Sequence, residues 1–167
     1  ADPWKKGDVN ICGLGNSISI RFRVTVGTQG FAFVYDTGID QVSVFDAAAS
    51  GPDLELVSVN TPVGGAACGS FSGNDPVAVT ISNTTCSAFN FATTPVTFTI
   101  AGTGPTTPSG TFTLNTGTLA GNASQNVTIG NVDFSASGIY TLDVTAAMQG
   151  DGNAANNSIT GLTYKSG

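Results

Sequence analysis

Charged residues are scarce in this chain of 167 residues, and histidine is absent. Asp, Glu, Lys and Arg make up 10% of the sequence, whereas about a quarter is usual. With five basic residues and a net charge of −6, the chain cannot form the basic patch that binds nucleic acid or an anionic membrane surface. No apolar run reaches the length of about 20 residues that a membrane-spanning helix needs. We therefore expect no nucleic-acid partner and no membrane insertion.

The groups that usually carry catalysis are also missing. Ser and Thr are plentiful, but without a histidine or a nearby lysine their hydroxyls cannot be activated as nucleophiles by the usual route. This composition predicts a protein that is not an enzyme.

Cysteine is limited to Cys12, Cys68 and Cys86, and their spacing fits no zinc pattern. In a secreted protein Cys68 and Cys86 would close a loop within one β domain, a bridge worth about 3 kcal/mol. Cys12 would then be free or paired outside this chain. The alternative is three buried free thiols. The composition resembles that of an extracellular protein and favours the Cys68–Cys86 disulfide.

The residues that are abundant predict an all-β fold. Hydrophobic residues make up 40% of the chain, and they alternate with small polar residues in long runs, which is typical of half-buried strands. Thr, Val, Ile and Phe are frequent and favour strands. Long helical patterns of Leu, Glu, Lys and Ala are missing, so the fold class is all-β.

Residues 1–47 predict a β-meander that resembles part of a larger sheet. Three segments alternate: SISIRFRVTV at 17–26, FAFVY at 31–35 and QVSVF at 41–45. A single layer cannot bury its own apolar face, so the downstream domain, missing strands or another subunit must cover it. We interpret this face as an interaction surface formed by Ile18, Ile20, Phe22, Val24, Phe31, Phe33 and Tyr35.

A small-residue linker at 48–53 separates the meander from a second domain at 54–167. There, turn signals separate about seven short strands, which is the strand count of an immunoglobulin-like antiparallel sandwich. The expected strands cover residues 54–59, 76–82, 95–100, 110–119, 124–130, 139–148 and 158–164. The Cys–Trp–Cys pattern of antibody domains is absent, since the one tryptophan is Trp4.

Residues 54–163 resemble the CARDB-like, immunoglobulin-type repeats of large secreted Bacteroidetes proteins. The matching stretches are PVAVTISNTTCSAFNFATTPVTFTIAGTGP, LNTGTLAGNASQNVTI and SASGIYTLDVTAAMQGDGNAANNSI. Residues 17–46 are similar to the last strands of a MAM-like jelly roll. The resemblance implies a non-catalytic module of a multi-domain surface protein, which is extracellular and acts as a stalk, an adhesive module or a filament unit.

One motif indicates catalysis instead. An apolar strand runs into Asp36-Thr37-Gly38, which resembles the signature of an aspartic protease of the retroviral type, in which two subunits share a proton between two aspartates. The later flap and second strand of that family are not evident. The alternative is a polar turn within the meander.

Two acidic stretches are candidate calcium sites, because turn carboxylates and carbonyls supply the oxygen ligands that calcium needs. Asp36 and Asp40 form the first. Asp151 and Asn153, followed by Asn156 and Asn157, form the second, although this stretch lacks the Gly position and the closing Glu of an EF-hand. The alternative at both stretches is a turn in which Asp and Asn bond their own backbone.

These features predict a non-catalytic extracellular module of a bacterial cell-surface or filament protein. Its N-terminal β segment would assemble with neighbouring modules or with other copies. The alternative is a calcium-assisted module that binds cell-surface glycans through the aromatic residues of the meander, and a dimeric aspartic protease is third. No cofactor is required, and calcium is the one candidate.

Overall fold

The computed structural model describes residues 19–22, 42, 51–64 and 71–167. The chain divides into two units, Ala1–Ala47 and Ala48–Gly167, and each is treated by itself. In the first unit, residues 19–22 and Val42 belong to no strand, although the alternation predicts strands there. An extended segment becomes a strand only when its backbone pairs with a neighbour, and these described residues have none. The rest of the predicted meander lies outside the described residues.

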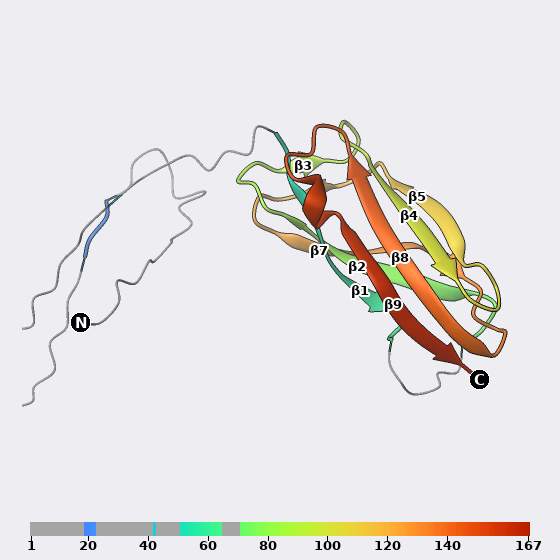
Figure 1. The fold of residues 1–167 in the computed structure, drawn as a ribbon. Coiled ribbons are helices and arrows are strands. Elements are labelled where there is room, and N and C mark those ends of the chain that lie inside the picture. The colour runs from blue at the N-terminus through green and yellow to red at the C-terminus, as the bar shows by residue number, and fades with distance from the viewer. Residues whose placement is uncertain (1–18, 23–41, 43–50, 65–70) are drawn as a thin grey trace, which may run out of the picture. The chain divides into compact units, whose positions relative to one another are not determined.

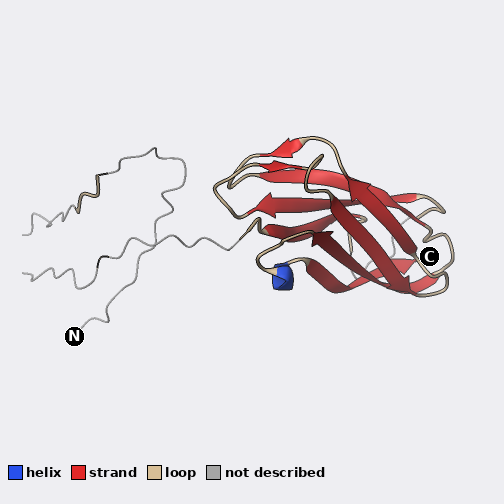
Figure 2. Ribbon diagram, turned by 90° about the horizontal axis from the view of Figure 1, so that it is seen from above, coloured by secondary structure: helices blue, strands red, loops and turns tan. Residues whose placement is uncertain are grey.

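The second unit is a sandwich of antiparallel strands, as predicted. One sheet has the order β1-β2-β7, formed by Leu54–Thr61, Asp75–Asn83 and Ser124–Val132. The other has the order β5-β4-β8-β9, formed by Ser109–Leu114, Val96–Thr103, Gly138–Met148 and Ser158–Ser166. Figures 1 and 2 show the two sheets packed face to face as two layers.

Two smaller elements lie in the connections. The short strands β3 (Phe89–Asn90) and β6 (Thr118–Leu119) pair with each other. A single 3-10 turn, η1 (Ala154–Asn156), lies between β8 and β9 at one end of the sandwich (Figure 2). The segment 110–119, predicted as one strand, is divided between β5 and β6. Gly117, whose φ of +91° is unfavourable for other residues, lies in the break.

Alternate residues of each strand fill the space between the sheets. Their side chains are buried because successive side chains of a strand point to opposite faces, and burying each large one contributes about 1.5–3 kcal/mol. The innermost set on β2, β4 and β8 is Val77, Val79, Ile81, Val96, Phe98, Ile100, Tyr140, Leu142 and Val144.

A buried tyrosine fixes the point where the chain crosses from one sheet to the other. Tyr140 lies near the start of β8 with a side chain that is 0% exposed, and its hydroxyl donates a hydrogen bond of 2.8 Å to the carbonyl of Ala136. Its ring packs edge-on against Phe134, with centroids 4.8 Å apart. A Cβ on Gly104 would come within 2.5 Å of the same ring. A tyrosine that bonds back to the backbone at this corner is a hallmark of immunoglobulin-type sandwiches.

The two ends of the sandwich differ in chemistry, and we name them after one residue each. At the Asp151 end lie the start of β1, the end of β2 and the β8–β9 connection, joined by a bond of 2.8 Å from the Gly152 N–H to the Pro52 carbonyl. At the Phe134 end lie the start of β2, the end of β7 and the end of β9, where Phe71, Phe134 and Tyr164 form an aromatic cluster. The backbone therefore enters the sandwich at one end and leaves β9 at the other.

Candidate functional site

Asp151 ties three segments together at the Asp151 end. Its Oδ1 accepts a hydrogen bond of 2.9 Å from the Asn153 N–H. Its Oδ2 accepts one of 3.3 Å from the Leu54 N–H at the start of β1 and one of 2.9 Å from Nδ2 of Asn157. A single half-buried carboxylate thus connects the first strand of one sheet with the β8–β9 connection of the other.

Asp53 lies beside this carboxylate, contributed by a segment far away in the sequence. Its Oδ1 accepts a bond of 3.0 Å from Nδ2 of Asn156. Both asparagines therefore aim their amide groups at the two carboxylates. Their other amide atoms, Oδ1 of Asn156 and Oδ1 of Asn157, are buried and have no hydrogen-bond partner. We call Asp53, Asp151, Asn156 and Asn157 the Asp–Asn cluster.

The structure brings together some of the residues of the second predicted calcium stretch and adds Asp53 from outside it. Asp151 is central to the cluster, whereas Asn153 contributes its backbone N–H and is exposed. Asp36 and Asp40, the first predicted stretch, lie outside the described residues. Within residues 51–64 and 71–167, no three acidic or cysteine side chains gather in one place, so any cation held here would depend on amide and carbonyl oxygens as well.

A second polar group lies at the same end and is fully buried. Asn83, at the end of β2, is 0% exposed. Its Nδ2 donates to the carbonyls of Ser87, Leu119 and Ala120 at 2.7, 3.2 and 3.2 Å, and its Oδ1 accepts from the N–H and the hydroxyl of Thr85 at 3.0 and 2.7 Å. Asn83 therefore fixes the connection after β2 to the end of β6. This role was not predicted, although Asn83 closes the PVAVTISN stretch on which the resemblance to CARDB-like repeats rests.

Cys86 follows in that connection and is disulfide-bonded. Its backbone lies directly against Gly121 at the Asp151 end. Both other cysteines of the chain, Cys12 and Cys68, lie outside the described residues, so the predicted pairing of Cys68 with Cys86 stays a prediction.

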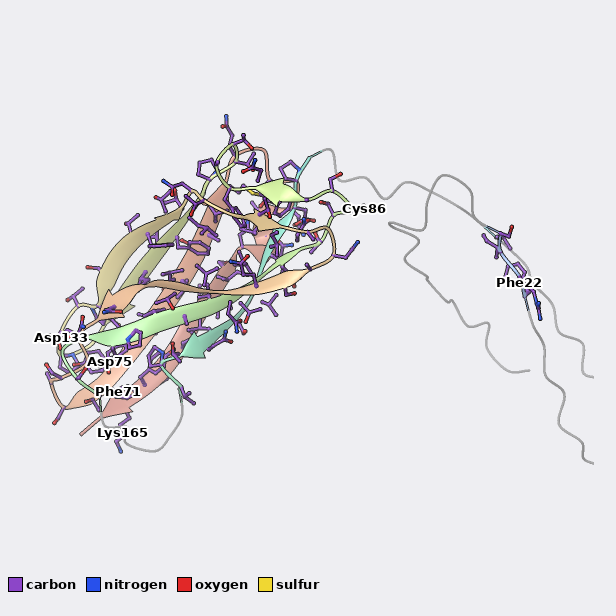
Figure 3. All side chains as sticks on the ribbon, turned by 180° about the vertical axis from the view of Figure 1, so that it is seen from behind. Phe22, Phe71, Asp75, Cys86, Asp133 and Lys165 are labelled. Carbon is purple, nitrogen blue, oxygen red and sulfur yellow. The ribbon has the colours of Figure 1, made fainter. Side chains whose placement is uncertain are left out.

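Gly64 and Phe71 both contact Tyr164 at the Phe134 end, and Figure 3 shows Phe71 and Cys86 at opposite ends of the sandwich.

The predicted interaction face is described at two positions. Ile20 and Phe22 are 53% and 56% exposed, and Phe22 is drawn in Figure 3. More than half of the surface of each side chain is therefore open to solvent. Ile18, Val24, Phe31, Phe33 and Tyr35 lie outside the described residues, as do Asp36, Thr37 and Gly38 of the protease-like motif.

The edges of the sandwich are unequally protected against pairing with another strand. The outer strands β1 and β9 contain register shifts and carry Glu55 and Lys165, and β7 has one register shift against β2. β5 pairs with β4 in unbroken register and contains neither charge nor proline. Bulges, charges and prolines are the usual devices that block an edge, so β5 is the unprotected edge of the described sandwich.

Among the described residues, two ionisable groups have shifted pKa values, and both lie at the Phe134 end. The hydroxyl and N–H of Ser135, which donate to Asp133 at 2.6 and 2.9 Å, lower the pKa of that exposed carboxyl. Burial raises the pKa of Tyr164. Both shifts are explained by local structure.

Comparison with protein-family models and with curated proteins finds no match for this chain. In the part of the chain that the structure describes, no helix has the length and apolar character to cross a membrane.

Proposed function

We propose that the chain is a non-catalytic structural or adhesive module of an extracellular bacterial surface or filament protein, as its resemblance to CARDB-like repeats implies. Copies assemble when the alternating segment 17–26 of one copy pairs as an added strand with the β5 edge of the next. The observation that carries this proposal is the β5 edge, which is regular, uncharged and unpaired on its outer side.

The segment 17–26 supports the donor half of the proposal. It alternates strictly between apolar and polar residues, which is the pattern of a strand with one buried face. At its described positions, Ile20 and Phe22 are exposed and outside any strand. Pairing with a sheet edge would satisfy its backbone hydrogen bonds and bury these side chains, which is how added strands gain affinity and specificity.

The surface of β5 supports the acceptor half. The exposed side chains Thr111 and Thr113 alternate with Phe112 and Leu114, which are half-buried against the core. An added strand with apolar residues at every second position would extend this apolar row. Phe112 already packs against Phe98, with ring centroids 6.4 Å apart.

Sedimentation analysis of the full chain over a concentration series, with electron microscopy of the most concentrated sample, tests the proposal. We expect assembly that Phe22→Ser weakens by removing the donor and that Thr111→Lys weakens by charging the acceptor edge. Thr163→Lys on β9 is the matched control, since it places the same charge on another edge strand, and it should assemble as the wild type does.

Mixing the two variants makes the test sharper. A Phe22→Ser copy keeps its acceptor edge and a Thr111→Lys copy keeps its donor segment, so an equal mixture should form dimers that neither variant forms alone. The proposal is refuted if the wild type stays a monomer at the highest concentration, or if Thr111→Lys assembles as well as Thr163→Lys.

A further inference from the structure

A glycine interrupts the side-chain pattern of β5, and the fold of a single copy does not require it. Gly110 lies opposite Ile100 in the unbroken register of β5 with β4, so it marks no bulge. Its φ is not positive, so the backbone does not demand glycine there. Apart from its chain neighbours, a Cβ at this position would meet one described atom within 4 Å, Cδ1 of Ile100, at the ordinary contact distance of 3.9 Å. The described structure therefore has room for a larger residue.

The place of Gly110 on an edge strand suggests what the glycine is for. Glycine inside a strand weakens it, and it often marks a site where a ligand or another backbone approaches closely. An aromatic residue on a neighbouring strand compensates for an edge glycine by covering it with its ring. On one side of β5 the neighbour of Gly110 is Ile100, and on the other side the described sandwich has no strand. An aromatic ring would therefore have to come from an added strand.

Gly110 lies on the face of β5 that is turned toward the other sheet. It shares this face with Phe112 and Leu114, which are half-buried against the core, whereas Gly110 contributes no side chain. β5 and β7 are each the last strand of their sheet, and they approach each other. A ring that covered Gly110 would lie on this side of the sandwich, between the two layers.

The donor segment holds one aromatic residue. Phe22 is the only aromatic residue of the segment 17–26, and its side chain is 56% exposed. In an added antiparallel strand with Phe22 opposite Gly110, Ile20 lies opposite Phe112, because residues two apart share a face. This register sets the largest donor side chain against the glycine and forms an apolar pair at the next position, and such cross-strand pairs stabilise sheets.

We propose that Phe22 of one copy covers Gly110 of the next copy and thereby sets the register of the added strand on β5. This inference rests on the proposed assembly, because it requires the segment 17–26 to pair with the β5 edge. A shift by one residue would turn Phe22 to the solvent face. A shift by two residues keeps the face but places Phe22 opposite Phe112 or Pro108. The pair of Phe22 with Gly110 is therefore the specificity determinant of the contact.

Binding of a labelled peptide with the sequence of residues 17–26 to the full Phe22→Ser chain, measured by fluorescence anisotropy, tests this pair. The Phe22→Ser chain keeps its β5 edge. We expect the peptide with Phe22→Ala to bind about tenfold more weakly than the wild-type peptide, because it buries a smaller apolar surface. Adding Gly110→Leu to the acceptor covers the glycine from within, so the two peptides should then differ less than threefold. Thr99→Leu, which adds the same side chain to the exposed face of β4, should keep the tenfold difference.

The melting temperature of each acceptor checks that it is folded. Gly110→Ala is the second variant, since its methyl group meets Ile100 at an ordinary contact distance, and it should reduce the difference between the peptides at least twofold. Failure of both peptides to bind contradicts the proposed assembly and this pair together. Binding that Thr111→Lys prevents, with the tenfold difference unchanged in both Gly110 variants, overturns the pair and leaves the edge pairing in place.

Discussion

Replacing Asn83 should destabilise the sandwich more than replacing any exposed asparagine. This side chain makes five hydrogen bonds, to Ser87, Leu119, Ala120 and twice to Thr85, while being 0% exposed. The bond to the Leu119 carbonyl is buried and the other four are part-buried, so water replaces the lost amide only in part. The Asn83→Ala variant therefore loses five hydrogen bonds and leaves the buried Leu119 carbonyl without this donor.

The expected loss of unfolding free energy follows from the hydrogen-bond partners of Asn83. A hydrogen bond contributes about 1 kcal/mol net, and a buried group left without a partner costs about 1–3 kcal/mol. With at least two carbonyls and one N–H affected, we expect Asn83→Ala to lower the free energy of unfolding by about 4 kcal/mol. Small proteins have about 5–15 kcal/mol in total. At a urea dependence of about 2 kcal/mol per molar, the midpoint should fall by about 2 M.

The stability of an Asn83→Asp variant should depend on pH. The new carboxyl would place an oxygen against three carbonyls, so burial and these acceptors favour its protonated form and raise its pKa in the folded state. A raised folded pKa means that the contribution to stability is present below the unfolded value of about 3.9 and is lost as the pH rises through the folded value. Asn83→Asp should therefore match or exceed Asn83→Ala at pH 4 and be less stable than Asn83→Ala at pH 7.

Urea unfolding of the full chain, with the disulfide intact, measures these differences. Asn131→Ala is the matched control, because Asn131 is exposed on β7 and makes one side-chain bond, of 3.0 Å, to Asn74. Its effect should stay within about 0.5 kcal/mol. An Asn83→Ala variant within 1 kcal/mol of the wild type would refute the reasoning, as would an Asn83→Asp variant whose stability relative to Asn83→Ala does not depend on pH.

Three further predictions use separate parts of the structure. Tyr140→Phe should lower the unfolding free energy by about 1–2 kcal/mol, measured by urea unfolding, because it removes the donor to the part-buried carbonyl of Ala136; an unchanged midpoint would show that the hydroxyl is dispensable. Peptide mapping without reduction should link Cys86, which is disulfide-bonded, to the peptide that contains Cys68, and a link to the peptide that contains Cys12 would contradict the predicted pairing. By carbon NMR, the carboxyl of Asp133 should titrate with a pKa below 3.8 and move upward in Ser135→Ala; the small stability that this lowered pKa supplies is present above the ordinary value and lost as the pH falls below it.

The strand pattern was predictable because each strand carries its own signal. Val77, Val79 and Ile81 alternate with the small residues Ala78, Thr80 and Ser82 on β2, and the structure buries all three apolar side chains completely. The seven predicted strands of the sandwich correspond to the seven long strands, with differences at their ends and the break at 115–117. Hydrophobic alternation suffices here because the period of a strand alone decides which side chains are buried.

The polar clusters were less predictable because they depend on which segments the fold brings together. The GDGNAANN stretch indicated Asp151 as a candidate residue. The contribution of Asp53 was not predictable, because its neighbour Leu54 is 97 positions away from Asp151 in the sequence. The same holds for Cys86, whose disulfide partner is not identified by spacing along the chain. Sequence spacing measures distance along the chain, whereas a disulfide or a ligand set requires proximity in space.

The entry and exit of the chain at opposite ends of the sandwich give the module a defined mechanical response. In a series of such modules, tension would act nearly parallel to the strands and therefore perpendicular to the hydrogen bonds between them. The bonds of β1 with β2 and of β8 with β9 would be sheared together, whereas a pull at one end would open them one after another. A module of this geometry resists stretching with its whole ladder at once, and the contacts of Asp151 lie at the point where the force enters β1.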